Sequence, residues 1–240
     1  MTWHENLQDF GEEIEPDATF RFECQPELSC FGMCCRTEIT LTPYDIARMR
    51  RHLYIDSGMF LSTYCETYID SRTGFPFVIL KHKKDGTCVF LRRDGCDLYE
   101  SRPSCCRNYP LARVIDADGN TGKRLIKYYL QNRATYCEGL GRGPDWTIWD
   151  YCESNRLGPY EKANDLFLDI PFAFNMLPCK VRQDTTLRST VFQAVFNFDQ
   201  FFKKYGRSPN AGFAKDDHEM IVLVRNIILN LIRRAPHPGL

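Results

Sequence analysis

Four cysteines near the start of the chain are the residues best placed to do chemistry. They occur within twelve positions, in the order C-x5-C-x3-C-C, as Cys24, Cys30, Cys34 and Cys35. Thiols this close in sequence are either metal ligands or disulfide partners. Successive side chains of an extended segment point to opposite faces, so the tandem pair Cys34-Cys35 predicts ligands to two centres or to two edges of one polynuclear cluster. The alternative is that one of the pair is a small buried apolar residue.

A second set of cysteines follows further along the chain. Its members are Cys88, Cys96, Cys105, Cys106 and Cys137. The Asp-Gly pair at residues 85–86 is a hairpin turn signal, which predicts a short ribbon with Cys88 and Cys96 at its ends. Pro103 and Pro110 then bracket a single turn. The two cysteines of that turn are adjacent, so only one of them is expected to point at the site that the ribbon approaches.

The clustering of thiols indicates metal binding but does not identify the metal. The spacings match neither the paired C-x2-C knuckles of zinc fingers and ribbons nor the C-x2-C-x2-C-x3-C-P run of bacterial ferredoxins. A ligand set made only of thiolates suits zinc, iron–sulfur clusters and Cu(I) alike. No histidine or carboxylate is spaced for a catalytic zinc site, and His82 near the predicted ribbon is a lone histidine.

The compartment of these thiols is expected to be reducing. Residues 1–19 are acidic and lack the basic and apolar regions of a secretory signal, and the longest apolar stretch, residues 220–232, is interrupted by Arg225 and two asparagines. We therefore expect the cytoplasm, where clustered cysteines bind metal or do redox chemistry. Structural disulfides are the alternative if a signal has been removed from the chain.

The charge of the chain is balanced, with 31 basic and 31 acidic residues. This balance gives no support for nucleic acid or an acidic membrane as a main partner. We expect a metal ion or cluster as the bound partner, together with a protein substrate or a redox partner if the protein is an enzyme.

The hydrophobic pattern predicts an α+β fold. We expect a cysteine-rich metal-binding region at residues 20–143, made of short β-hairpins, loops and two helices. A mainly helical region, residues 144–240, is expected to pack on it as one structural unit, after a polar lead-in at residues 1–19. At 240 residues, the chain can bury a sizeable core without covalent staples.

Individual elements follow from capping, turn and periodicity signals. Helices are predicted from Thr42-Pro43 to Leu53, from after Ser57 through Phe60, Tyr64 and Tyr68, and at residues 146–152, 160–174, 191–202 and 219–233. Strands are predicted at residues 20–22, 77–80, 88–91, 111–115 and 125–130, the last two joined by a turn at residues 118–120. Glycines at 139, 141 and 143 predict a loop behind a ligand, because a nucleotide site would need a strand-to-helix frame.

The order of these motifs resembles one family. The tandem cysteines are followed by L-T-P-Y-D-I, then C-V-F-L-x4-C-x2-Y-x2-R-P-x2-C-R-x-Y-P, then C-x-G-L-G-x-G. This pattern is similar to the YkgJ-like cysteine-cluster proteins, which carry the CxxCxxCC zinc- or iron-chelating domain. The resemblance covers residues 22–143, with a weaker echo at residues 157–167, and is most specific at residues 88–110.

The resemblance implies a bound zinc or iron–sulfur centre. It implies eight ligands, namely Cys24, Cys30, Cys34, Cys35, Cys88, Cys96, Cys106 and Cys137. Cys105 falls on a variable position of the motif, and the spacing after Cys24 is longer here than in the family, which gives the loop freedom to move that thiol away. One branch of the family resembles flagellin lysine methylases with an iron–sulfur cluster, but those proteins are longer and no S-adenosylmethionine motif is found here.

Eight thiolates with two divalent ions retain a net negative charge, so positive neighbours are needed. Arg36, Arg102 and Arg107 flank the cysteines, and backbone N–H groups of the turns can donate to the sulfurs. The alternative for these arginines is surface solubility.

Two functions from different classes follow from the sequence. The first is a cysteine-ligated metalloprotein with an iron–sulfur cluster or zinc and a redox or protein-modification role. The second is a non-catalytic interaction module with a structural zinc site. No catalytic residue is assigned, although Tyr109, Asp97 and His82 lie near the cysteines in sequence.

Overall fold

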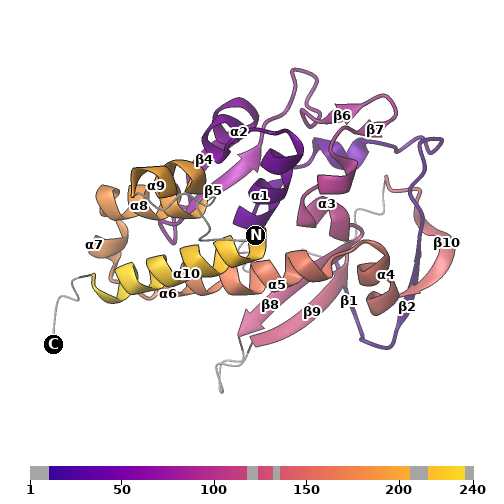
Figure 1. Ribbon diagram of the computed structural model, residues 1–240. Helices are drawn as coiled ribbons and strands as arrows, with labels where there is room; N and C mark the ends of the chain where they lie inside the picture. Colours follow the sequence, from indigo (N-terminus) through magenta and orange to yellow (C-terminus); the bar gives the residue numbers. More distant parts are fainter. Residues whose placement is uncertain (1–10, 118–123, 132–135, 206–215, 236–240) are drawn as a thin grey trace.

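The computed structural model of the protein describes residues 11–117, 124–131, 136–205 and 216–235 (Figure 1). Within these residues, the longer helices pack around one small antiparallel sheet, and the other small sheets lie toward the opposite side with short helices beside them. The arrangement is α+β with a helical C-terminal region, which confirms the predicted fold class.

All the strand pairs are antiparallel, and they form four small sheets in the described part of the chain. The strands are β1 (Glu12–Ile14), β2 (Thr19–Phe22), β3 (Thr40–Leu41), β4 (Cys65–Ile69), β5 (Pro76–Leu80), β6 (Leu91–Arg92), β7 (Gly95–Cys96), β8 (Leu111–Ala117), β9 (Arg124–Leu130) and β10 (Leu140–Thr147). The sheet orders are β1-β9-β8, β10-β2, β3-β5-β4 and β6-β7. The predicted hairpin of β8 and β9 is confirmed, while its expected turn at residues 118–120 lies outside the described residues.

Short helices carry part of the cysteine region, and longer ones build the other side of the molecule. They are the 3-10 helices η2 (Met33–Arg36) and η3 (Tyr99–Ser101), and the α-helices α1 (Pro43–His52), α2 (Ser57–Tyr64), α3 (Ser104–Asn108), α4 (Ile148–Ser154), α5 (Gly158–Phe167), α6 (Asp169–Asn175), α7 (Cys179–Arg182), α8 (Thr185–Val195), α9 (Phe198–Lys204) and α10 (Asp217–Arg233). In Figure 1, α10 runs alongside α5 and α6.

Two helices begin where local capping chemistry predicts them. Thr42 and Asp45 form a reciprocal capping box at the start of α1, and Pro43 occupies its first turn. Asp56 accepts a hydrogen bond from the Met59 N–H and so caps α2. These caps satisfy backbone donors that a helix leaves unpaired at its N-terminus.

Four predicted elements differ from the structure. Tyr68 lies in β4 opposite Phe77 instead of in α2, because the β-prone run of β4 pairs along its whole length with β5. Residues 88–91 form no return strand beside β5, whose two edges are taken by β3 and β4, and only an isolated bridge joins His82 to Cys88. The predicted helix at residues 160–174 is divided into α5 and α6, and that at 191–202 into α8 and α9.

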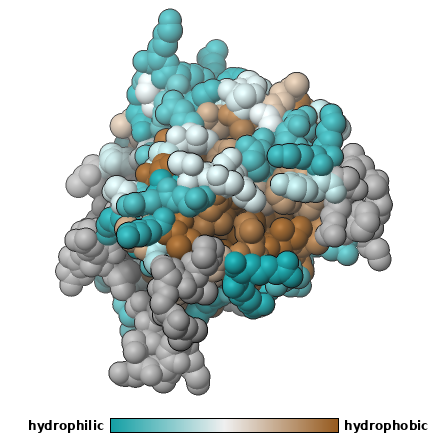
Figure 2. All heavy atoms as spheres, turned by 90° about the vertical axis from the view of Figure 1, so that its left-hand side faces the viewer, coloured by the Kyte–Doolittle hydropathy of each residue, from teal (hydrophilic) through white to brown (hydrophobic). Residues whose placement is uncertain are grey.

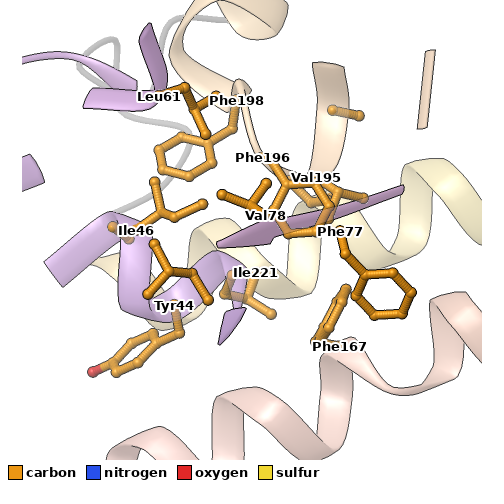
Figure 3. Packing of buried hydrophobic residues seen from close by; sticks show 14 of the residues in the cluster. Tyr44, Ile46, Leu61, Phe77, Val78, Phe167, Val195, Phe196, Phe198 and Ile221 are labelled. Carbon is orange, nitrogen blue, oxygen red and sulfur yellow. The ribbon is translucent and has the colours of Figure 1, made fainter. Parts of the chain in front are cut away.

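Two hydrophobic clusters stabilise these elements. The larger one joins α1, α2, β5 and the helices from α5 to α10, and Figure 3 shows Ile46, Val78, Phe196 and other members of this cluster packing together. The smaller one lies between β2, β8 and α4, and includes Phe22. Burial of apolar side chains contributes about 25 cal/mol per Å² of area removed from water, so the larger cluster is the main source of stability.

The helical side also carries apolar side chains at its surface. Figure 2 shows this side, the left of Figure 1, with an apolar area flanked by hydrophilic residues. Among the described residues, no helix has the length and apolar character needed to cross a membrane.

Candidate metal centres

The tandem pair Cys34-Cys35 lies in η2, a 3-10 helix instead of the extended segment that the sequence suggested. Gly32 precedes it with φ of 80°, a left-handed conformation that glycine adopts without strain. A 3-10 helix has three residues per turn, so neighbouring side chains still diverge. Cys34 lines a small cavity with Cys24 and Tyr109, whereas Cys35 packs against the larger hydrophobic cluster, which includes Cys88. The two thiols also contact each other. The pair is therefore the boundary between two adjoining groups of thiols.

The first thiol group consists of Cys24, Cys30, Cys34 and Cys137. These four residues line a small cavity of about 20 Å³, together with Phe22, Leu28, Tyr109, Tyr136 and Gly139. Cys24 is exposed, so the cavity lies close to the surface. The longer spacing between Cys24 and Cys30 therefore leaves both thiols at the same cavity.

The β2–β10 ladder brings the ends of the first thiol group together. Leu140 of β10 lies opposite Phe22 of β2, and the Glu23 N–H donates to the Gly139 carbonyl at 3.1 Å. A Cβ on Gly139 would lie 2.6 Å from the Glu23 carbonyl oxygen, so only glycine allows this close approach. The glycine-rich run at residues 139–143 thus lies at the start of β10 instead of forming the predicted loop. Its pairing with β2 places Cys137 near Cys24.

A backbone donor faces one sulfur of the first thiol group. The Glu138 N–H donates to Cys30 Sγ at 3.3 Å. Hydrogen bonds of this kind withdraw charge from thiolate ligands and orient them. The sequence predicted such donors at the turns, and here the donor comes from a segment more than a hundred positions away along the chain.

The second thiol group consists of Cys35, Cys88, Cys96 and Cys106. The Cys88 N–H donates to the Cys35 carbonyl at 2.7 Å, and Cys96 lies in β7 opposite Leu91 of β6. Cys88 belongs to the larger hydrophobic cluster, and the other three pack against it. Cys35 comes from η2, Cys88 from an isolated bridge to His82, Cys96 from the β6–β7 ribbon and Cys106 from the single turn of α3.

Helix α3 separates the two cysteines of the Pro-bracketed turn. Cys106 points inward toward Cys35 and Cys88, whereas Cys105 is exposed and its sulfur lies 3.7 Å from the Thr40 carbonyl oxygen. The divergence agrees with the predicted knuckle. The Cys105 thiol nevertheless contacts that of Cys106, and this contact and then burial raise the pKa of Cys106. Burial, and after it the charges of Cys96 and Cys105, raise the pKa of Cys88.

The sequence missed the residue that holds α3 in place, namely Asp45. Its carboxylate is fully buried and accepts from the Thr42 N–H at 2.8 Å, from the Ser104 N–H at 2.7 Å and from both hydroxyls of these residues. Helix α3 has no side-chain cap of its own, so Asp45 caps both α1 and α3. Burial raises the pKa of Asp45, and these hydrogen bonds oppose the rise. The sequence pattern T-x-x-D predicts that Asp45 caps α1, but it gives no sign that Asp45 also caps α3.

The three flanking arginines have different surroundings. Burial raises the pKa of Cys24 and Cys96, and the positive charge of Arg102 opposes that rise at both, so Arg102 acts on both thiol groups. Arg107 is buried and donates to the carbonyls of Glu100 and Asn155, so its guanidinium is engaged by backbone. Arg36 is bound to the Asp85 carbonyl at 2.6 Å. Arg102 therefore has the best position to offset thiolate charge.

The remaining polar residues named by the sequence lie apart from the sulfurs or have other partners. The His82 imidazole contacts the Thr37 carbonyl at 3.1 Å, and Asp97 pairs with Arg92 at 2.6 Å. Tyr109, in contrast, lines the cavity of the first thiol group. Three further cysteines, Cys65, Cys152 and Cys179, belong to neither thiol group.

The chemistry of the two groups fits a thiophilic metal. Without a cation, crowded thiols resist ionisation: burial and then the charges of Cys34, Cys30 and Cys137 raise the pKa of Cys24 to about 11. The Cys34 thiol and then burial raise the pKa of Cys35 as well. A bound cation reverses this preference and releases protons. In the described ranges, no three cysteine, histidine or acidic side chains have the geometry of a formed metal site.

The comparison with known families agrees with this donor set. Residues 23–138 match the family model CxxCxxCC, described as a putative zinc- or iron-chelating domain. No curated protein and no solved structure matches the chain. The matched segment contains both thiol groups, so the match agrees with the predicted family and supports metal binding by residues 23–138 in general.

Proposed function

We propose that the protein holds two adjoining all-thiolate metal centres, one in each thiol group. Cys24, Cys30, Cys34 and Cys137 hold the first centre, and Cys35, Cys88, Cys96 and Cys106 hold the second. The observation that carries this proposal is the division at Cys34-Cys35: Cys34 lines the cavity of the first thiol group, whereas Cys35 packs against the larger hydrophobic cluster with the second. Four sulfur donors complete the usual coordination of zinc, and four cysteines also hold an iron–sulfur cluster.

The proposed metal is iron in an iron–sulfur cluster, with zinc as the alternative. The sulfur-only donor set and the adjacency of the groups favour iron–sulfur chemistry. A bound iron–sulfur cluster supplies one-electron transfer, whereas zinc supplies a cross-link between chain segments. The chain's own residues orient the sulfurs through the Glu138 N–H and offset their charge through Arg102.

The surroundings of the two groups support a redox or protein-modification role for the first centre and a structural role for the second. Cys24 reaches the surface, where a protein substrate or redox partner can approach, while the second thiol group packs on the core. Reduced thiols are kept in the cytoplasm, which is the proposed location. The alternative function is a non-catalytic interaction module in which zinc is structural at both centres.

Anaerobic purification followed by visible absorption and metal analysis tests the proposal. Visible charge-transfer absorption with iron and acid-labile sulfide is the expected result. Colourless protein with stoichiometric zinc would replace the iron–sulfur proposal with the zinc alternative. Protein that binds neither metal after reconstitution would contradict metal binding at these cysteines.

A further inference from the structure

The hydroxyl of Tyr109 is an unexplained polar group at the first thiol group. Tyr109 follows α3, and its carbonyl accepts a hydrogen bond from the Tyr151 hydroxyl. Its ring packs edge-on against Phe22 with 5.6 Å between centroids. These two contacts fix the ring at the wall of the cavity that the four thiols line.

The Tyr109 hydroxyl is buried and makes no hydrogen bond of acceptable geometry to any described residue. Burial of a hydroxyl without a partner costs about 1–3 kcal/mol, so such a group in a folded protein needs a reason. The Tyr109 side chain contacts the Cys137 side chain, and both line the same cavity. A tyrosine hydroxyl carries its proton at neutral pH and can donate it in a hydrogen bond.

The acceptor strength of that sulfur depends on its ionisation. A neutral thiol is a weak acceptor, whereas a thiolate accepts a charge-assisted hydrogen bond about twice as strong as a neutral one. Deprotonation of Cys137 on metal binding would therefore give the orphaned hydroxyl the partner it lacks. The Glu138 N–H already supplies such a donor to Cys30, so the first thiol group would then have a donor at two of its four sulfurs.

We propose that Tyr109 is a positioning residue of the first centre, donating its O–H to the Cys137 thiolate when a metal is bound. This inference rests on the proposed function, because it requires a metal at the first thiol group. The hydrogen bond withdraws charge from one sulfur, which holds the Cys137 side chain in its binding orientation and lowers the energy of the sulfur lone pairs.

The test compares Tyr109→Phe with Tyr136→Phe in the full-length chain. Phenylalanine keeps the ring that packs on Phe22 and removes only the hydroxyl. Tyr136 lines the same cavity, so its variant controls for loss of a tyrosine hydroxyl there. Each protein is loaded anaerobically with Co²⁺, the sulfur-to-cobalt charge-transfer band is recorded, and a chelator then competes for the metal.

Tyr109→Phe is expected to bind as much cobalt as the wild-type chain, with a charge-transfer band that moves to lower energy for the first centre. It should release that metal about tenfold more readily, the smaller end of the loss measured when an outer hydrogen bond to a ligand is removed. Tyr136→Phe should match the wild-type chain. An unchanged band and affinity in Tyr109→Phe, or the same change in both variants, would overturn the inference.

A measurement on the wild-type chain keeps the inference testable if Tyr109→Phe does not fold. Loading with Co²⁺ should shift the ultraviolet absorption of one tyrosine to lower energy, because its O–H begins to donate to a thiolate. Tyr136→Phe should retain that shift. Cobalt binding without any tyrosine shift would overturn the inference alone, whereas a wild-type chain that binds no cobalt would overturn the proposed function as well.

Discussion

The two thiol groups share their donor chemistry but differ in what surrounds them. Cys24 of the first thiol group is exposed, and the group lies beside the smaller hydrophobic cluster. In the second thiol group, Cys88 is 5% exposed and belongs to the larger cluster. Removal of a ligand should therefore open the surface in the first case and disturb the core in the second.

The two groups also differ in how the chain holds them without a metal. The first is held by the ladder of β2 with β10, supported by the Trp146 indole N–H, which donates to the Phe22 carbonyl at 3.1 Å. The second is held by two-residue strands and the single turn of α3. Elements this short are not stable alone, because helix nucleation is unfavourable and an isolated hairpin is marginal. The second centre should therefore contribute more to folding than the first.

Removal of all metal has the largest expected effect on stability. Metal binding to a site that the unfolded chain lacks is folding free energy, worth about 10 kcal/mol or more in zinc-finger peptides. A chelator should therefore unfold residues 20–143, as measured by limited proteolysis and by a thermal transition followed with circular dichroism. If the metal-free chain keeps its thermal transition, neither thiol group stabilises the fold through a bound metal, and the two groups do not differ in their contribution to folding.

Substitutions of the paired cysteines of α3 test the second thiol group directly. Cys106→Ser should lose the second metal and most of the stability linked to it, because Cys106 points inward toward Cys35 and Cys88. Cys105→Ser should keep the metal, with a change in unfolding free energy on the order of 1 kcal/mol. Metal content and denaturant unfolding measure both effects. Equal metal loss in the two variants would show that both cysteines of the turn are ligands, one to each centre. Loss only in Cys105→Ser would show that the family motif has been aligned to the wrong cysteine.

Asp45→Asn tests whether the Asp45 cap of α3 helps to hold the second thiol group in place. Asparagine cannot accept at its amide nitrogen, so donors of Thr42 or Ser104 lose their partner, at a cost of about 1–3 kcal/mol. Asp56→Asn is the matched control, because asparagine caps as well as aspartate and the change at α2 should be a few tenths of a kcal/mol. Both variants are measured by denaturant unfolding. Equal losses of unfolding free energy would show that Asp45 contributes no more than an ordinary helix cap.

Cys24→Ser should have the smallest effect on stability. We expect the first metal to bind weakly or not at all, while unfolding free energy falls by roughly 1 kcal/mol, as for an ordinary substitution. The measurements are metal analysis and denaturant unfolding, with Cys106→Ser alongside. A larger loss of stability in Cys24→Ser than in Cys106→Ser would reverse the comparison.

Features set by nearby residues were predictable from the sequence. The start of α1 follows from the local Thr42-Pro43 signal, and the β8–β9 hairpin from two β-prone runs around a turn. The cysteine region was recognisable from its motifs, and the family match agrees with them. Element type was less certain where pairing decides it, as for Tyr68, which joins β4 because β5 is available as a partner.

Features set by contacts between distant residues were not predictable. Asp45 caps α3 across 59 positions of sequence, and no local pattern shows that Ser104 will lie beside it. Likewise, no local pattern divides the thiols into two groups of four, because Cys137 reaches the cavity that Cys24 lines only through the pairing of β2 with β10. The role of the eight cysteines as ligands stays a prediction.

Metal stoichiometry in Cys34→Ser and Cys35→Ser tests the central claim most directly, because these adjacent residues belong to different thiol groups. Each variant is purified anaerobically beside the wild-type chain, and metal per chain is measured by elemental analysis and native mass spectrometry. Two separate centres predict that each variant loses one centre and retains the other, with the larger loss of stability in Cys35→Ser. Loss of all metal in both variants would show one shared cluster and contradict the division.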